Sequence, residues 1–157
     1  MTEERYVANR RIDAPAEQVF ALLTDPTRHQ ETEPSDWVRD AIDTAPITSV
    51  GQVFEMNMYL DVIGGAYTMH NEVIALEPDR TVAWAPGQSD GNGGVDRAGW
   101  TWRYDLAPRN DGTDVTLTYD WSATPQSTRD EIGGLPPFPA SFLDKSLNSL
   151  ATALARV

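Results

Sequence analysis

The sequence contains no cysteine among its 157 residues. Disulfide bonds, thiolate nucleophiles and cysteine metal sites are therefore excluded. Positive charge is also scarce, because 12 lysines and arginines stand against 24 acidic residues and leave a formal net charge of −12 at pH 7. A surface of this sign repels phosphate backbones and anionic lipids. We therefore expect neither nucleic acid nor a membrane among the partners.

Long apolar runs and chemical signature motifs are missing as well. No stretch approaches the ~20 residues that span a bilayer, and the charged start MTEERYVANR lacks the apolar core of a signal peptide. We therefore expect a cytoplasmic protein. The two histidines, His29 and His70, lie far apart and, without a thiol, predict no metal site. The GNGG segment at 91–94 lacks the Gly-Lys-Ser/Thr of a phosphate loop, and no Gly-x-Ser-x-Gly elbow occurs, so no cofactor is predicted.

Alternation of apolar and polar residues dominates the chain. In GWTWRYDL, at 99–106, Trp100, Trp102 and Tyr104 fall on one side of an extended segment, and Arg103 and Asp105 fall on the other. The same period of two, with turn residues between segments, predicts seven strands at 6–13, 37–44, 54–60, 66–77, 80–85, 99–107 and 115–121. Continuous apolar residues at 73–76 leave the phase of the fourth strand open.

Helices are predicted near the two ends of the chain. One begins at Ala14-Pro15, with Glu17 in its first turn, and ends at Asp25-Pro26, and a short second helix or a loop follows at 27–36. Another covers 140–155, where leucines recur at helical spacing: Leu143, Leu147, Leu150 and Leu154. Turn-forming residues predict a flexible loop at 86–99 and irregular structure in the GGLPPFP of 133–139.

These elements predict one α+β domain over residues 1–157, in which a curled antiparallel sheet grips the C-terminal helix. Seven strands are roughly 30 Å wide, whereas one helix with its side chains is about 10–12 Å wide. The sheet must therefore curl around the helix to bury its apolar face, and such curling tends to leave a hollow.

The hollow has two interpretations. As a ligand chamber it would have a volume of about 300 Å³ or more, with the segments 87–94 and 133–139 gating entry. Its predicted ligand-binding residues are Met56, Met58, Trp84, Trp100, Trp102, Tyr119 and Trp121. Alternatively, the same aromatic side chains fill the hollow and form an ordinary core. The polar tips of Trp and Tyr suit a ligand's polar groups and favour the chamber.

Several segments resemble one protein family. RRIDAPAEQVFALLTDPTRH, VGQVFEM, EVIALEPDRTVAW, GWTWRYDLAP and DGTDVTLTYDW are similar to the START-like superfamily, specifically its bacterial SRPBCC, or polyketide cyclase/dehydrase-like, group. Residues 12–20 and 76–80 are the most specific parts. The resemblance implies the Bet v 1-like helix-grip fold, with a seven-stranded antiparallel sheet wrapped around a long C-terminal helix. Members bind lipids, sterols, polyketides or plant hormones, cyclise polyketides, or act as protein-binding modules.

Three functional hypotheses follow. The first is a protein that binds a small, largely apolar molecule, such as a polyketide, lipid or aromatic metabolite, between the sheet and the C-terminal helix. The second is a cyclase- or dehydrase-type enzyme acting on a ligand in the same place. The third is a protein-interaction module similar to chaperone ATPase activators, which requires a filled interior and an apolar outer sheet face. A homodimer is left open.

Two residues are candidates for catalysis. His70 could serve as a base, with Asp61 or Glu72 nearby, if its side chain faces inward; otherwise it is a structural histidine. One phase of the first strand carries Arg10 into the interior, where it needs an internal carboxylate or a ligand's acid group as partner, and the other phase leaves it in solvent. His29 lies among acidic residues and is predicted to be solvated on the surface.

Overall fold

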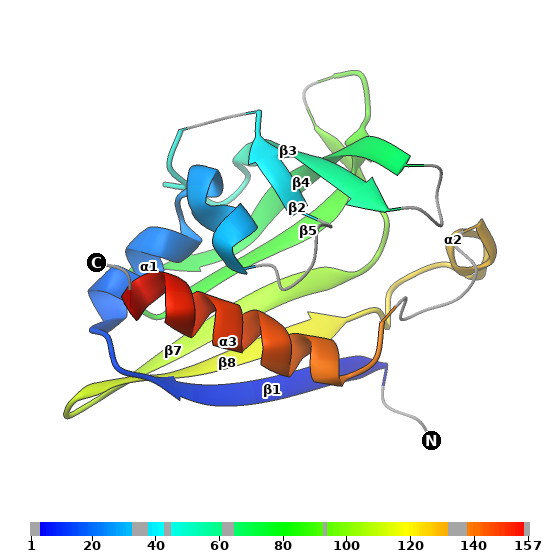
Figure 1. Ribbon diagram of the computed structural model, residues 1–157. Coiled ribbons are helices and arrows are strands. Elements are labelled where there is room, and N and C mark those ends of the chain that lie inside the picture. The colour runs from blue at the N-terminus through cyan, green and yellow to red at the C-terminus, as the bar shows by residue number, and fades with distance from the viewer. Residues whose placement is uncertain are drawn as a thin grey trace.

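A computed structural model describes residues 4–32, 38–42, 45–60, 65–92, 94–131 and 138–155, except for the side chain of Leu60. The elements in chain order are β1 (Arg5–Ile12), α1 (Ala16–Leu23), the 3-10 helix η1 (Pro26–Thr32), β2 (Val38–Ala41), β3 (Val53–Leu60), β4 (Gly65–Glu77), β5 (Thr81–Ser89), β6 (Val95–Arg97), β7 (Thr101–Arg109), β8 (Gly112–Asp120), α2 (Gln126–Glu131) and α3 (Ser141–Ala155). Figure 1 shows α3 lying across β1, β8 and β7 on the concave side of the curled sheet.

The strands form one antiparallel sheet. Its order is β1-β8-β7-β5-β4-β3-β2, and β6 pairs with β5 beside this path. The first strand therefore lies next to the last, with Arg5 opposite Asp120 and Ile12 opposite Thr113. The predicted α+β helix-grip architecture is confirmed, and the seven predicted strands correspond to the seven strands of the main path.

The predicted loop at 86–99 is wrong for half of its length, because residues 86–89 and 95–97 lie in strands. The strand β5 continues through Pro86 to Ser89, and β6 returns beside it, with Gly87 opposite Arg97. A Cβ on Gly87 would lie 2.2 Å from the backbone oxygen of Asp96, so the close approach of β6 requires glycine at this position. Glycine is typical of loops, but in this segment it allows two strands to approach closely. The helix α2 was also not predicted.

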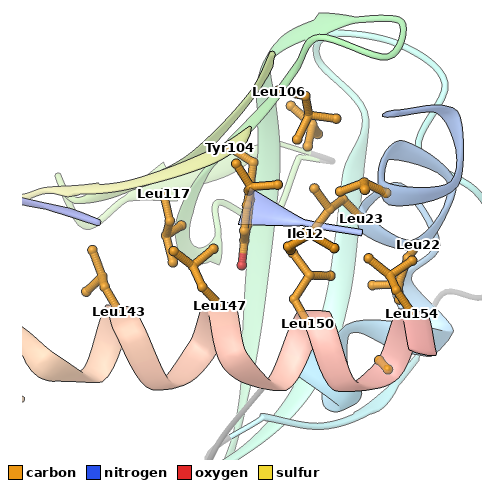
Figure 2. Close-up of a cluster of buried hydrophobic side chains, with 14 of the residues drawn as sticks. Ile12, Leu22, Leu23, Tyr104, Leu106, Leu117, Leu143, Leu147, Leu150 and Leu154 are labelled. Carbon is orange, nitrogen blue, oxygen red and sulfur yellow. The ribbon is translucent and has the colours of Figure 1, made fainter. Parts of the chain in front are cut away.

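The helices bury the faces that their spacing predicts. Glu17 lies in the first turn of α1, and Val19, Leu22 and Leu23 are buried beneath it. All four leucines of the α3 stripe are buried. Figure 2 shows this stripe pointing toward side chains of the sheet and of α1, among them Ile12, Leu22, Leu23, Tyr104 and Leu117. One end of the interior is therefore a densely packed aliphatic core.

Within the described residues, α1 and η1 cover the concave face of the sheet together with α3. The helix α1 contacts β5, β7 and β8, and η1 contacts β2 and α3. The hydroxyl of Ser146 on α3 donates a hydrogen bond to the backbone oxygen of Thr32 at the end of η1, over 2.8 Å. The width that α3 alone leaves uncovered is therefore partly closed by α1 and η1.

Candidate ligand-binding cavity

The alternation along β7 directs its aromatic side chains inward. Tyr104 and Leu106 are buried, whereas Arg103 and Asp105 lie on the outer face, where Nε of the arginine and Oδ2 of the aspartate are 2.9 Å apart. Trp100 and Trp102 pack against the core from the same side as Tyr104. The phase predicted from GWTWRYDL is therefore the phase of the structure.

The inward-facing rings divide into two groups. One is a packed set that we call the aromatic cluster: Tyr6, Trp102, Tyr119, Trp121, Phe138 and Phe142. Phe138 stacks on Trp102, with centroids 5.8 Å apart and planes at 12°, and lies 4.9 Å from the ring of Tyr119. Tyr6 meets Trp121 edge-on at 5.0 Å. Burial raises the pKa of Tyr119 and keeps its phenol neutral. This end of the predicted hollow is filled.

The second group of rings surrounds a cavity between η1, α3 and the sheet. Its volume is about 80 Å³. The lining residues are His29, Thr32, Val38, Phe54, Met56, Met58, Met69, Asn71, Trp84, Pro86, Trp100, Trp102, Tyr104, Phe142 and Ser146. The set includes five of the seven predicted ligand-binding residues (Met56, Met58, Trp84, Trp100 and Trp102), whereas Tyr119 and Trp121 belong only to the aromatic cluster.

The cavity is smaller than the chamber predicted from the sequence. A volume of about 80 Å³ falls below the roughly 300 Å³ at which pockets for drug-sized ligands begin. Two features of the fold explain the difference. The aromatic cluster fills the end of the hollow near Phe138, and α1 and η1 cover sheet area that α3 alone leaves uncovered.

His29 is the main correction to the sequence analysis. It is not solvated: only 6% of its surface is exposed, and its ring lines the cavity. It stacks on Trp84, with centroids 5.1 Å apart and planes at 17°, and meets Phe54 edge-on at 5.4 Å. Its Nε2 lies 2.6 Å from the backbone oxygen of Leu23. Burial lowers the pKa of His29 because it disfavours the charged imidazolium.

The spacing of η1 could have revealed this histidine. A 3-10 helix has three residues per turn, so Pro26, His29 and Thr32 share one side of η1. Pro26 and His29 are buried, and Thr32 lines the cavity together with His29. The acidic residues around His29 in the sequence indicate an exposed segment and obscure this period.

The lining also contains non-aromatic polar side chains, and these donate hydrogen bonds to backbone carbonyl oxygens. The hydroxyl of Thr32 donates to the oxygen of His29 over 2.8 Å, and Nδ2 of Asn71 donates to that of Phe54 over 3.4 Å. Ser146 bonds Thr32 as described above. Among the described residues that line the cavity, none is Asp, Glu, Lys or Arg. No group of three or more potential metal ligands occurs in the described part of the chain.

Neither catalytic candidate lines the cavity. Met69 and Asn71 flank His70 on β4 and line the cavity, so the alternation places His70 on the outer face, where its Nε2 is 3.2 Å from Oε1 of Glu55. Glu72 pairs instead with Arg97, at 3.0 Å, and Asp61 lies outside the described residues. A catalytic role for His70 stays a prediction, and it would operate away from this cavity.

Arg10 lies on the α3 side of β1 yet remains exposed. It shares its strand face with Ala8 and Ile12, which are both buried. Its Nη1 donates to Oδ1 of Asn148 on α3 over 2.8 Å. The guanidinium therefore binds the surface of the C-terminal helix and does not enter the cavity.

The two predicted gating segments have different outcomes. Residues 87–94 include the end of β5 and the turn toward β6, directly after Pro86, which lines the cavity. Most of 133–139 lies outside the described residues, although Phe138 is placed in the aromatic cluster. Gating by either segment stays a prediction. No described helix is long and apolar enough to cross a membrane.

Two curated proteins are similar to this chain in sequence. Two uncharacterized proteins of Mycobacterium tuberculosis, from strains H37Rv and CDC 1551, are each 29% identical over 150 residues, covering 92% of this chain and 62% of each relative. The chain thus spans less than two thirds of the length of these relatives.

Solved structures show the same fold. A crystal structure of a Nitrosomonas europaea protein aligns with a TM-score of 0.73 at 17% identity, covering 99% of this chain and 97% of that one. Ginseng major latex-like protein 151 from Panax ginseng aligns with a TM-score of 0.65 at 15% identity, covering 97% and 95%. The family model described as polyketide cyclase / dehydrase and lipid transport matches residues 4–155. Because this match spans nearly the whole chain, the protein belongs to that family, and the resemblance drawn from its motifs is confirmed.

Proposed function

We propose that the protein binds a small, largely apolar molecule in the cavity between η1, α3 and the sheet. The observation that carries this proposal is the lining itself, which consists mainly of methionine and aromatic side chains and has no carboxylate or guanidinium among its described members. Apolar walls with a few polar groups are typical of small-molecule sites. The family description, with its polyketide enzymes and lipid transport, supports a ligand of polyketide, lipid or aromatic character.

The cavity volume limits the ligand that fits without rearrangement. A cavity of about 150 Å³ lined by apolar side chains accommodates benzene, so about 80 Å³ holds less than one full ring. Met56, Met58 and Met69 line the cavity, and the unbranched methionine side chain changes rotamer readily. We therefore expect binding of a single-ring molecule to move these three methionines.

The alternatives receive less support. His70 and Arg10 lie outside the cavity, so in the cyclase or dehydrase alternative neither of the two predicted catalytic residues lies beside the ligand. The interaction module requires an apolar outer face, but β7 and β8 present charged and polar residues there, such as Arg103, Asp105 and Thr116. Binding of a small molecule is the function that this geometry supports best.

The methionines provide the test. The chain has four, of which Met56, Met58 and Met69 line the cavity and Met1 is the first residue. The test is an NMR titration with p-xylene of protein labelled with ¹³C at the methionine methyl groups. The three cavity resonances should move together, and the resonance of Met1 should stay unchanged. Assignment follows from Met→Leu variants. Saturating p-xylene without movement of the three cavity resonances would contradict the proposal.

A further inference from the structure

The buried histidine of η1 has a defined protonation pattern. A backbone carbonyl oxygen can only accept a hydrogen bond, so the 2.6 Å contact with Leu23 places the proton of His29 on Nε2. Leu23 is the last residue of α1, where carbonyls lack helical partners, so the imidazole also satisfies a free helix end. In neutral imidazole, Nδ1 is then an acceptor. Among the described residues, Nδ1 forms no hydrogen bond.

The surroundings hold this ring in place and keep it uncharged. Trp84 stacks against one face, and the edge contact with Phe54 fixes the ring further. Burial favours the neutral imidazole, in agreement with the lowered pKa. The ring lines the cavity, so a fixed acceptor belongs to a wall that is otherwise mainly apolar.

The remaining polar groups of the lining favour the same kind of ligand. The hydroxyls of Thr32 and Ser146 and Nδ2 of Asn71 already donate to backbone oxygens. A carboxylate placed here would lose its hydration without gaining a cation, since no described lining residue is Lys or Arg. A ligand hydroxyl or N–H group, in contrast, gains an acceptor.

We infer that His29 is a specificity-determining residue of the cavity, whose Nδ1 accepts a hydrogen bond from an uncharged ligand that carries a hydroxyl or N–H group. This inference rests on the proposed function. It assigns the cavity a preference for neutral molecules with a hydrogen-bond donor over fully apolar molecules of the same shape, and it excludes carboxylates.

Two neutral probes of nearly the same shape, p-cresol and p-xylene, and one larger anion, p-toluate, test the inference. Their affinities are measured by the methionine methyl titration on wild type and on His29→Phe, His29→Gln and Ser149→Ala. The ratio of p-cresol to p-xylene affinity should fall about fivefold in His29→Phe, the equivalent of one net hydrogen bond. His29→Gln should restore the ratio, because its amide can both donate to Leu23 and accept from the ligand. Ser149→Ala, on α3 and outside the lining, should leave the ratio unchanged.

A second readout does not depend on the folding of the Phe variant. In wild-type protein, the ¹⁵N resonance of His29 Nδ1 should move with p-cresol and not with p-xylene, and p-toluate should show no saturable binding. If both neutral probes bind but the ratio is unchanged in His29→Phe, or Nδ1 does not respond to saturating p-cresol, this inference is overturned and the proposed function stands. If neither neutral probe moves the cavity methionines, the proposed function fails and the inference fails with it.

Discussion

Replacing Ser146 with methionine should fill the cavity from α3 while preserving the fold. Ser146 is 6% exposed, lines the cavity and lies on the buried side of the helix. The longer side chain therefore extends into the space that we assign to the ligand. Methionine also has a higher helix propensity than serine and can adapt to an irregular space.

The expected change in stability is small because two effects oppose each other. Cavities destabilise by about 24 cal/mol per Å³, so filling all of the 80 Å³ stabilises by at most about 1.9 kcal/mol. Losing the hydrogen bond from Ser146 to Thr32 costs about 0.5–1.5 kcal/mol. The free energy of unfolding should stay within about 1.5 kcal/mol of the wild-type value, and Tm within about 6 °C.

The assay combines thermal unfolding with p-xylene titration of the methionine methyl groups. We expect near-wild-type Tm together with loss of saturable binding. Ser149→Met is the matched control, because it makes the same substitution on the same helix at a residue outside the lining, and it should bind p-xylene normally. Wild-type p-xylene affinity in Ser146→Met would refute the assignment of this cavity as the site. A fall in Tm of 10 °C or more would show that the space is not available to a side chain.

Other predictions concern stability. Since the folded state lowers the pKa of His29 from 6.5, the unfolded chain binds the proton more readily. The contribution of the neutral imidazole to the free energy of unfolding is therefore complete above about pH 6.5 and is lost as the pH falls toward the folded pKa. Urea unfolding should show that this loss is smaller in His29→Gln. Leu147→Ala, at a residue with 1% exposure on α3, should lower the free energy of unfolding by about 2–5 kcal/mol, seen as a lower urea midpoint without a change in m-value. Gly99→Ala should cost more than about 2 kcal/mol by the same measurement, because Gly99 has φ +113° and a Cβ there would lie 2.5 Å from Cα of Thr124. Gly91→Ala, at φ +83° with open space around it, should cost only about 1 kcal/mol, and equal losses at the two glycines would contradict the steric explanation.

Most of the fold could be predicted because the periodic segments are long and regular. Trp102, Tyr104 and Leu106 alternate with polar residues, so a single phase of β7 turns all three inward. In β4 the apolar run has a local cause: the pairing with β5 shifts register between Val73 and Ala75. A bulge of this kind changes which side chains face inward, and the sequence pattern alone does not locate it.

The cavity could be predicted only in part. Trp84 and Met56 followed from strand alternation. The burial of His29 shows in the sequence only through the three-residue period of η1, and its stacking partner Trp84 lies far away along the chain. The small volume depends on Phe138 packing against Tyr119 and Trp102. Phe138 lies in a segment whose proline and glycine residues indicate no regular structure, so nothing local predicts that its ring enters the interior.

The pairing of β1 with β8 also delays the folding of this chain on the ribosome. More than 100 residues separate Ile12 from its partner Thr113, and at typical rates of synthesis this interval takes roughly 5–20 s. Throughout that time the nascent β1 segment, RYVANRRI, exposes both of its edges without its partner strand. Its three arginines oppose association with other nascent chains. These charges lie outside the buried core of the folded protein, yet they protect the segment until β8 is synthesised.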